Sequence, residues 1–273
     1  TGDHNTAFGM GALGKNTTGN RNVSIGRSSM GEPDTENDNI AIGYNSLSGS
    51  VAGGEYNVAI GSNSLDALTS SDNNVAIGYN AGSAVTTGDN SVYIGYAAGL
   101  NATTGSTNTF IGMQTAGLGV VTGGTNIGVG AQSLYDLTSG AGNVAMGYRS
   151  GYNLTTAAGN TMLGTQAVGT GVLTGNNNVV IGKLAGENMT SADANVIIGE
   201  DAGAAQTTAN NNVLIGQAAG EALTTGGDNI FIGQAAGDGH DAETNNIGIG
   251  KAALGGSING GEYNVAIGNY TLD

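Results

Sequence analysis

The sequence predicts an all-β fold, a parallel β-solenoid of sixteen coils with 17 or 18 residues each. Three observations lead to this prediction: a five-residue pattern that recurs sixteen times, a spacing too short for a pair of helices, and glycine at 52 of 273 positions. Because the repeats cover the whole sequence, we expect one continuous domain over residues 1–273.

The recurring pattern is Asn-Val-x-Ile-Gly, as at residues 57–61, 74–78 and 212–216. Its closing glycine recurs at intervals of 17 residues eleven times and of 18 residues four times. A small residue follows three positions later, and a less regular stretch then leads to the next asparagine. Each coil therefore reads as a strand, a tight corner, a less regular segment and a second corner. We expect the extra residue of the longer coils in the less regular segment.

The middle residue of the pattern, x, predicts contact between chains. Side chains alternate along a strand, so Val and Ile share one face and the middle residue lies on the other. We expect Val and Ile to fill the interior of the coil. The middle residue is almost always apolar or small, and a strand that is apolar on both faces is buried on both. The predicted inter-chain face comprises Tyr93, Phe110, Met162, Val180, Ile197, Leu214 and Phe231. A closed homotrimer is the simplest assembly that covers it.

Asparagine opens fifteen of the sixteen copies, and Ser91 opens the other. Asparagine tolerates left-handed backbone geometry and bonds nearby backbone groups, and stacked asparagines can form ladders. We therefore expect a corner ladder that includes Asn57, Asn74, Asn143, Asn178, Asn212 and Asn229. The closing glycine predicts a sharp turn with positive φ.

The segment Asn74 to Gly82, Asn-Val-Ala-Ile-Gly-Tyr-Asn-Ala-Gly, resembles the head repeats of trimeric autotransporter adhesins (YadA-like heads) and the similar repeats of phage tail fibres. The resemblance covers all sixteen copies. It implies a left-handed β-roll, three chains side by side and a role in attachment. The repeats here are longer than those usual in the family heads.

Composition argues against several classes of function. The net charge is −15 with only six Lys and Arg residues, so we expect no nucleic-acid partner. No run of about 20 apolar residues is present, so we expect no membrane insertion as a helix. No phosphate-binding loop and no Ser-His-Asp set can be assigned, which predicts a protein without catalytic residues or cofactors.

Three features of the sequence are compatible with cation binding or ice binding. His240, in the acidic run 238–241, and His4 are expected in solvated loops, although the run could touch a cation. The acidic stretch 32–38 could bind Ca²⁺ but has no EF-hand pattern. Recurring threonines, as at Thr86 and Thr87, raise an ice-binding alternative; neighbouring threonines are expected to face opposite ways and leave a single column.

These observations predict a structural or adhesive fibre segment, a trimeric β-roll rod for surface attachment. We expect it outside the cell, on a bacterial surface or a virion appendage. Its partners would be copies of itself and a host-surface receptor, a glycan or a protein. An alternative is a filament subunit that assembles by end-to-end stacking.

Overall fold

The computed structural model describes residues 2–32, 35–49, 54–256 and 260–272. Within them the protein is an all-β parallel solenoid with sixteen three-residue strands and no helix. The chain divides into two compact units, residues 1–139 and 140–273. The same coil is used in both units, and the single continuous domain stays a prediction.

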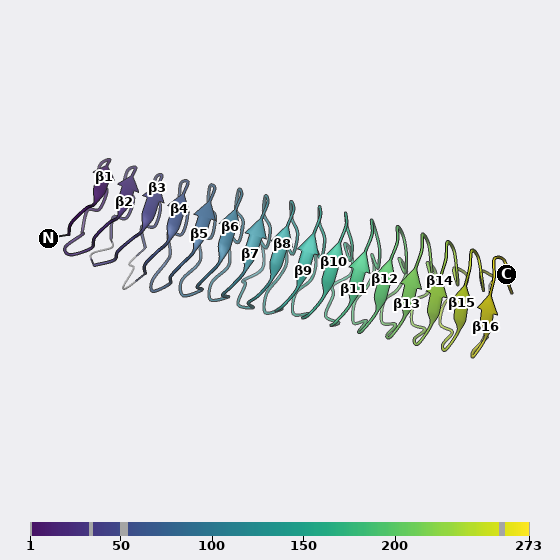
Figure 1. The fold of residues 1–273 in the computed structure, drawn as a ribbon. Helices are drawn as coiled ribbons and strands as arrows, with labels where there is room; N and C mark the ends of the chain where they lie inside the picture. Colours follow the sequence, from purple (N-terminus) through teal and green to yellow (C-terminus); the bar gives the residue numbers. More distant parts are fainter. Residues whose placement is uncertain (1, 33–34, 50–53, 257–259, 273) are drawn as a thin grey trace. The chain divides into compact units, whose positions relative to one another are not determined.

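Each unit contains eight strands that pair in parallel and in chain order (Figure 1). The strands of the first unit are β1 (Thr6–Phe8), β2 (Val23–Ile25), β3 (Ile40–Ile42), β4 (Val58–Ile60), β5 (Val75–Ile77), β6 (Val92–Ile94), β7 (Thr109–Ile111) and β8 (Ile127–Val129). Those of the second unit are β9 (Val144–Met146), β10 (Thr161–Leu163), β11 (Val179–Ile181), β12 (Val196–Ile198), β13 (Val213–Ile215), β14 (Ile230–Ile232), β15 (Ile247–Ile249) and β16 (Val265–Ile267).

The pairing register is one whole coil. In β4 and β5, for example, Val58 pairs with Val75 and Ile60 with Ile77. Each position of the repeat therefore lies beside the same position of the next coil, at about the 4.8 Å spacing of adjacent strands. We call such a series of equivalent positions a column.

The assignment of the two strand faces from the sequence was wrong. The middle residues point into the coil, and all except Ala7 are buried within this one chain. The seven residues predicted as an inter-chain face all have 0% exposure and belong to the interior of their own coils: Tyr93, Phe110, Met162, Val180, Ile197, Leu214 and Phe231. Burial raises the pKa of Tyr93 to about 12. The Val and Ile columns instead point outward and are half-buried or exposed.

The interior explains why the middle residue varies so much in size. The position six residues later, which we call the filler column, also points inward, and its size is complementary. In most coils alanine or glycine in the middle is accompanied by a large filler, as in Ala59 with Leu65. Ala76 with Gly82 and Ala145 with Gly151 are exceptions. At Gly82 the side chains of Leu65 and Tyr93 approach from the neighbouring coils. A large middle residue is accompanied by a small filler, as in Tyr93 with Gly99. The two columns share one compartment, and in most coils a large residue in one column is matched by a small residue in the other, as close packing favours.

The closing glycines have the positive φ that the sequence predicts, between 128° and 142°. A Cβ atom at Gly216 would lie 2.4 Å from the carbonyl oxygen of Gly233 in the next coil, and the neighbouring pairs within each unit repeat this close approach. Glycine is therefore required by the stacking distance as well as by the turn.

The extra residue of the longer coils lies in the less regular segment, as predicted, in two of the four cases. Leu118 and Val120 protrude into solvent in one of these coils, and Val172 protrudes in another. In the coils that end at Gly61 and Gly268, parts of this segment lie outside the described residues.

The shared compartment predicts a compensating pair of substitutions. Gly99→Leu alone should lower the free energy of unfolding by about 3 kcal/mol, because even a Cβ there would lie 2.3 Å from the Tyr93 ring. The double variant Tyr93→Ala/Gly99→Leu reproduces the natural pair Ala59 and Leu65, whose Leu has a similar φ of 48°. It should recover all but about 1 kcal/mol in urea denaturation. A double variant as unstable as the single one would contradict the shared compartment.

Candidate partner-binding face

The outer face of each sheet is an apolar surface made by the Val and Ile columns. Several of these side chains remain exposed to solvent, with 37% for Ile77, 40% for Ile127 and 44% for Met146, and most others are half-buried. The neighbouring coils cover the flanks of these side chains, so the exposed part of each side chain faces away from the protein. Eight strands at about 4.8 Å give each unit an apolar stripe about 34 Å long.

The column directly after the closing glycine, which we call the flank column, borders this face. In the first unit it carries large apolar or aromatic residues, among them Tyr44, Tyr79, Tyr96 and Met113, each about half exposed. In the second unit it is mostly polar, with Lys183 and Glu200 forming an ion pair at 2.9 Å. The exposed apolar surface is therefore wider in the first unit.

The predicted corner ladder is present in the interior corner. Asn57 shows its geometry: its side-chain oxygen accepts from the backbone N–H of Asn74 at 2.9 Å, and its amide donates to the carbonyl of Ser71 at 2.8 Å. In each of the other predicted members the side-chain oxygen accepts from the next coil in the same way: Asn74, Asn143, Asn178, Asn212 and Asn229. Positive φ belongs to the residue before the ladder, such as Asn73 at 59°, and not to the ladder asparagine itself.

The ladder explains why asparagine, and not aspartate, fills this column. The Asn57 side chain both accepts from and donates to the next coil, and an amide can do both. A carboxylate would lose the donor and would stack buried negative charges about 4.8 Å apart. Ser91 fits because its hydroxyl accepts from the N–H of Asn108 at 3.1 Å.

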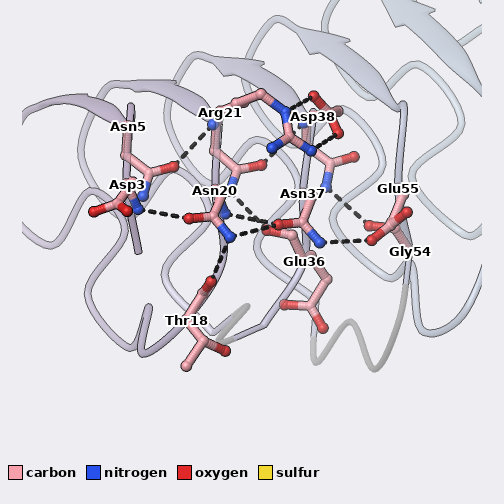
Figure 2. Close-up of polar contacts among 12 residues, drawn as sticks. Asp3, Asn5, Thr18, Asn20, Arg21, Glu36, Asn37, Asp38, Gly54 and Glu55 are labelled. Atoms are coloured by element: carbon pink, nitrogen blue, oxygen red, sulfur yellow. Dashed lines mark hydrogen bonds and ion pairs between the residues drawn. The ribbon is translucent and has the colours of Figure 1, made fainter. Parts of the chain in front are cut away.

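A second polar ladder lies outside the same corner, two residues before the interior one (Figure 2). Asn20 accepts from the N–H of Asp3 at 2.6 Å, and Asn37 accepts from that of Asn20 at 2.8 Å. Asn37 also donates to Glu55 at 2.7 Å. We did not predict this ladder from the sequence, although Asp, Asn and Glu recur at these positions. Its polar groups satisfy one another along the stack and suit a solvent-facing corner.

Among its described residues, the acidic stretch 32–38 forms no cluster that could hold Ca²⁺. Pro33 and Asp34 lie outside the described residues. Glu32 pairs with Lys15, and Asp38 accepts two bonds of 2.7 Å from the Arg21 guanidinium, which holds the pKa of Asp38 below its usual range (Figure 2). Across the described ranges, no group of three or more His, Asp and Glu side chains gathers that could hold a metal ion.

His240 contradicts the expectation of a solvated loop, whereas His4 is exposed as expected. His240 is fully buried, and its ring packs edge-on against Phe231 with centroids 5.0 Å apart. It occupies an interior column that holds leucine in other coils, such as Leu223. Neither ring nitrogen has a hydrogen-bond partner among the described residues. Burial lowers the pKa of His240, although Glu243, the Leu254 backbone and Asp238 act against this.

Glu243 is a second buried titratable group beside this histidine. One of its oxygens accepts from the N–H groups of Asp241 and Ala242, at 2.9 and 3.1 Å, and the other accepts from that of Gly260 at 3.1 Å. Burial raises the pKa of Glu243, but these donors outweigh it and lower the pKa overall. The carboxylate is therefore held ionised by backbone N–H groups, which donate to both of its oxygens.

The threonine columns differ from the expectation. Thr86 and Thr87 both lie on the outside, Thr86 half-buried and Thr87 exposed, because the backbone bends at these residues and is not an extended strand. The Thr86 hydroxyl donates to the carbonyl of Thr103 at 3.2 Å, which ties this column to the next coil. The threonines thus form two columns on a bend, whereas the flat sheet face carries Val and Ile.

Searches with this chain found no matching family model, no matching curated protein and no matching solved structure. In the described part of the chain, no helix is long and apolar enough to cross a membrane. What can be said of function therefore rests on the surfaces of the solenoid itself.

The environment of His240 predicts a loss of stability at mildly acidic pH. Its pKa in the folded protein is below the ordinary value of about 6.5. As the pH falls below about 6.5, the unfolded chain takes up the proton first, and the free energy of unfolding should fall. His240→Leu, which places the usual residue in this column, should raise the melting temperature and flatten the profile between about pH 6.5 and 5.

The control is His4→Asn, since His4 is exposed and asparagine occupies its column in other coils. This variant should keep the slope of the natural protein. The same slope in His240→Leu would assign the pH dependence to other groups.

Proposed function

We propose that this protein is a structural rod of an extracellular fibre, in which three copies associate through their Val and Ile columns and present their remaining surfaces for attachment. The observation that carries the proposal is the outward apolar face along both sheets. An exposed apolar area of this length on a lone chain would promote aggregation, and large apolar patches usually mark contacts with another protein.

The face has the properties of an interface between identical rods. It is flat, apolar and nearly uniform along each unit, so it offers no distinctive site for a partner of different shape. A second copy carries the same spacing of about 4.8 Å and the same β-branched side chains. Three copies around a common axis would each bury the face completely and leave no unpaired apolar surface.

The attachment role rests on the resemblance of Asn-Val-Ala-Ile-Gly repeats to adhesin heads and phage fibres. The left-handed course of the coil, the trimer and the location on a cell surface or virion come from the same source. The polar corners and the flank column would remain accessible for a receptor. The proposal assigns no catalytic step and no cofactor.

The assembly can be tested by light scattering coupled to size-exclusion chromatography. The natural protein should have three times the chain mass of 26.7 kDa. The double variant Ile198→Asp/Ile215→Asp puts charges in the outward Ile column of the second unit and should reduce the mass to that of one chain or cause aggregation. Circular dichroism should remain that of the natural protein, because both side chains lie outside the coil.

Thr208→Asp/Thr225→Asp is the matched control, since these residues lie on an outer bend away from the strands. It should leave the mass unchanged. A natural protein that elutes as one chain, or a trimer that persists in the Ile198→Asp/Ile215→Asp variant, would refute the proposed interface. A series of increasing masses would favour the alternative of end-to-end stacking into a filament.

A further inference from the structure

The flank column of the first unit contains a gap in an otherwise continuous stack of aromatic and cationic side chains. In successive coils the column reads Arg27, Tyr44, Ser62, Tyr79 and Tyr96. Tyr79 and Tyr96 stack face to face, with centroids 5.7 Å apart and an angle of 13° between their planes. The Arg27 guanidinium lies 5.8 Å from the centre of the Tyr44 ring, over its face. Ser62 is the one small residue between these two pairs.

The two pairs support the walls of the gap. Since Arg27 covers one face of Tyr44, the other face is directed toward the coil of Ser62. Since Tyr96 covers one face of Tyr79, the opposite face of Tyr79 is also directed toward Ser62. Both tyrosines are about half exposed, at 46% and 50%. The stack therefore leaves two supported ring faces on either side of a small, solvent-accessible residue.

The width of the gap selects the kind of group that fits. Tyr44 and Tyr79 are two coils apart, so their rings are separated by about 10 Å. A planar group between two rings requires about 7 Å, which is two contacts of about 3.5 Å, and would touch only one wall here. A puckered saturated ring is thicker and presents C–H groups on both sides. Aromatic faces carry the negative part of the ring quadrupole and attract such C–H groups.

Polar groups lie at the level of the gap. The Ser62 hydroxyl makes no hydrogen bond to any described residue. The neighbouring Asn63 amide donates to Asn80 at 3.2 Å, and its side-chain oxygen accepts no hydrogen bond within the described ranges. A hydroxyl and an amide oxygen suit the hydroxyl groups of a sugar. The net charge of −15 favours a neutral ligand over an anionic one.

We propose that the gap between Tyr44 and Tyr79, above Ser62, binds a neutral pyranose ring of a glycan. This proposal rests on the attachment role proposed above, for which it names a class of ligand. The geometry of the site is complete within one chain. It lies beyond the closing glycine Gly61, beside the Val and Ile face and not within it. A trimer built on that face would carry one such site on each chain.

The test is saturation-transfer difference NMR on the natural protein, with methyl β-D-glucopyranoside, methyl β-D-galactopyranoside and methyl α-D-mannopyranoside as probes at millimolar concentration. At least one probe should receive saturation at its ring C–H protons. Ser62→Tyr completes the stack and fills the gap, and it should reduce the signal at least tenfold. Because tyrosine occupies this column in the coils on both sides, this variant should fold as the natural protein does.

Thr165→Tyr is the matched control, since it adds a tyrosine to the same column in the second unit. It should leave the signal unchanged. Tyr79→Phe keeps the ring and should retain binding, whereas Tyr79→Ala removes a wall and should lose it. No signal with any of the three probes, or equal signals in the natural protein and Ser62→Tyr, would overturn the proposal. Preferential saturation of a planar probe such as benzyl alcohol would also overturn it.

The mass of each variant separates this proposal from the assembly. A Ser62→Tyr protein that keeps the mass of the natural protein but loses sugar binding supports the site whatever that mass is. Sugar binding by a protein of single-chain mass would support the site and refute the trimer. A trimer that binds no sugar would support the assembly and refute the site.

Discussion

Coil-on-coil stacking is the constraint on which the rest of this structure depends. Each residue lies about 4.8 Å from the residue that holds the same position in the next coil, so every column must be compatible with itself. The closing glycines show the constraint at its strictest, because a Cβ at Gly216 would meet the carbonyl of Gly233 at 2.4 Å. The asparagine ladder satisfies the same constraint with hydrogen bonds, since the Asn57 side chain both accepts from and donates to the next coil.

Stacking also places different constraints on side-chain size in the interior and on the surface of the coil. Inside, the filler and middle columns vary in size, and in most coils they compensate for each other, as Ala59 with Leu65 and Tyr93 with Gly99 illustrate. Outside, no such sum applies, and the Val and Ile columns are nevertheless more uniform than the interior. These two columns are uniform although they have no packing partner in the described part of the chain, which is the physical reason to look for a partner outside it.

The sequence was sufficient to predict the coil length, the parallel pairing, the turn glycine and the asparagine ladder, because each follows from periodicity. It did not show which face of each strand points into the coil. Alternation separates the Val and Ile columns from the middle column but is silent on which of the two is inside when both are apolar. The complementary sizes at Gly128 with Leu134 and at Phe231 with Gly237 were the signal that could have decided it, since only residues in one compartment must compensate for each other. The environment of His240 was not predictable in this way, because it depends on a buried column recognised only once the fold is known.

Some residues that break a repeated column are compensated by other groups of the chain, and others are not. Ser91 breaks the asparagine ladder, but its hydroxyl accepts the same hydrogen bond. Glu243 brings a carboxylate into the interior, and three backbone N–H groups hold it there. Ser62 breaks the flank column between Tyr44 and Tyr79, and its hydroxyl makes no hydrogen bond to any described residue. A departure that the chain itself compensates needs no explanation beyond folding. Ser62 is a departure without such compensation, and for this reason we place the proposed sugar site there and not at the more conspicuous acidic or histidine-containing segments.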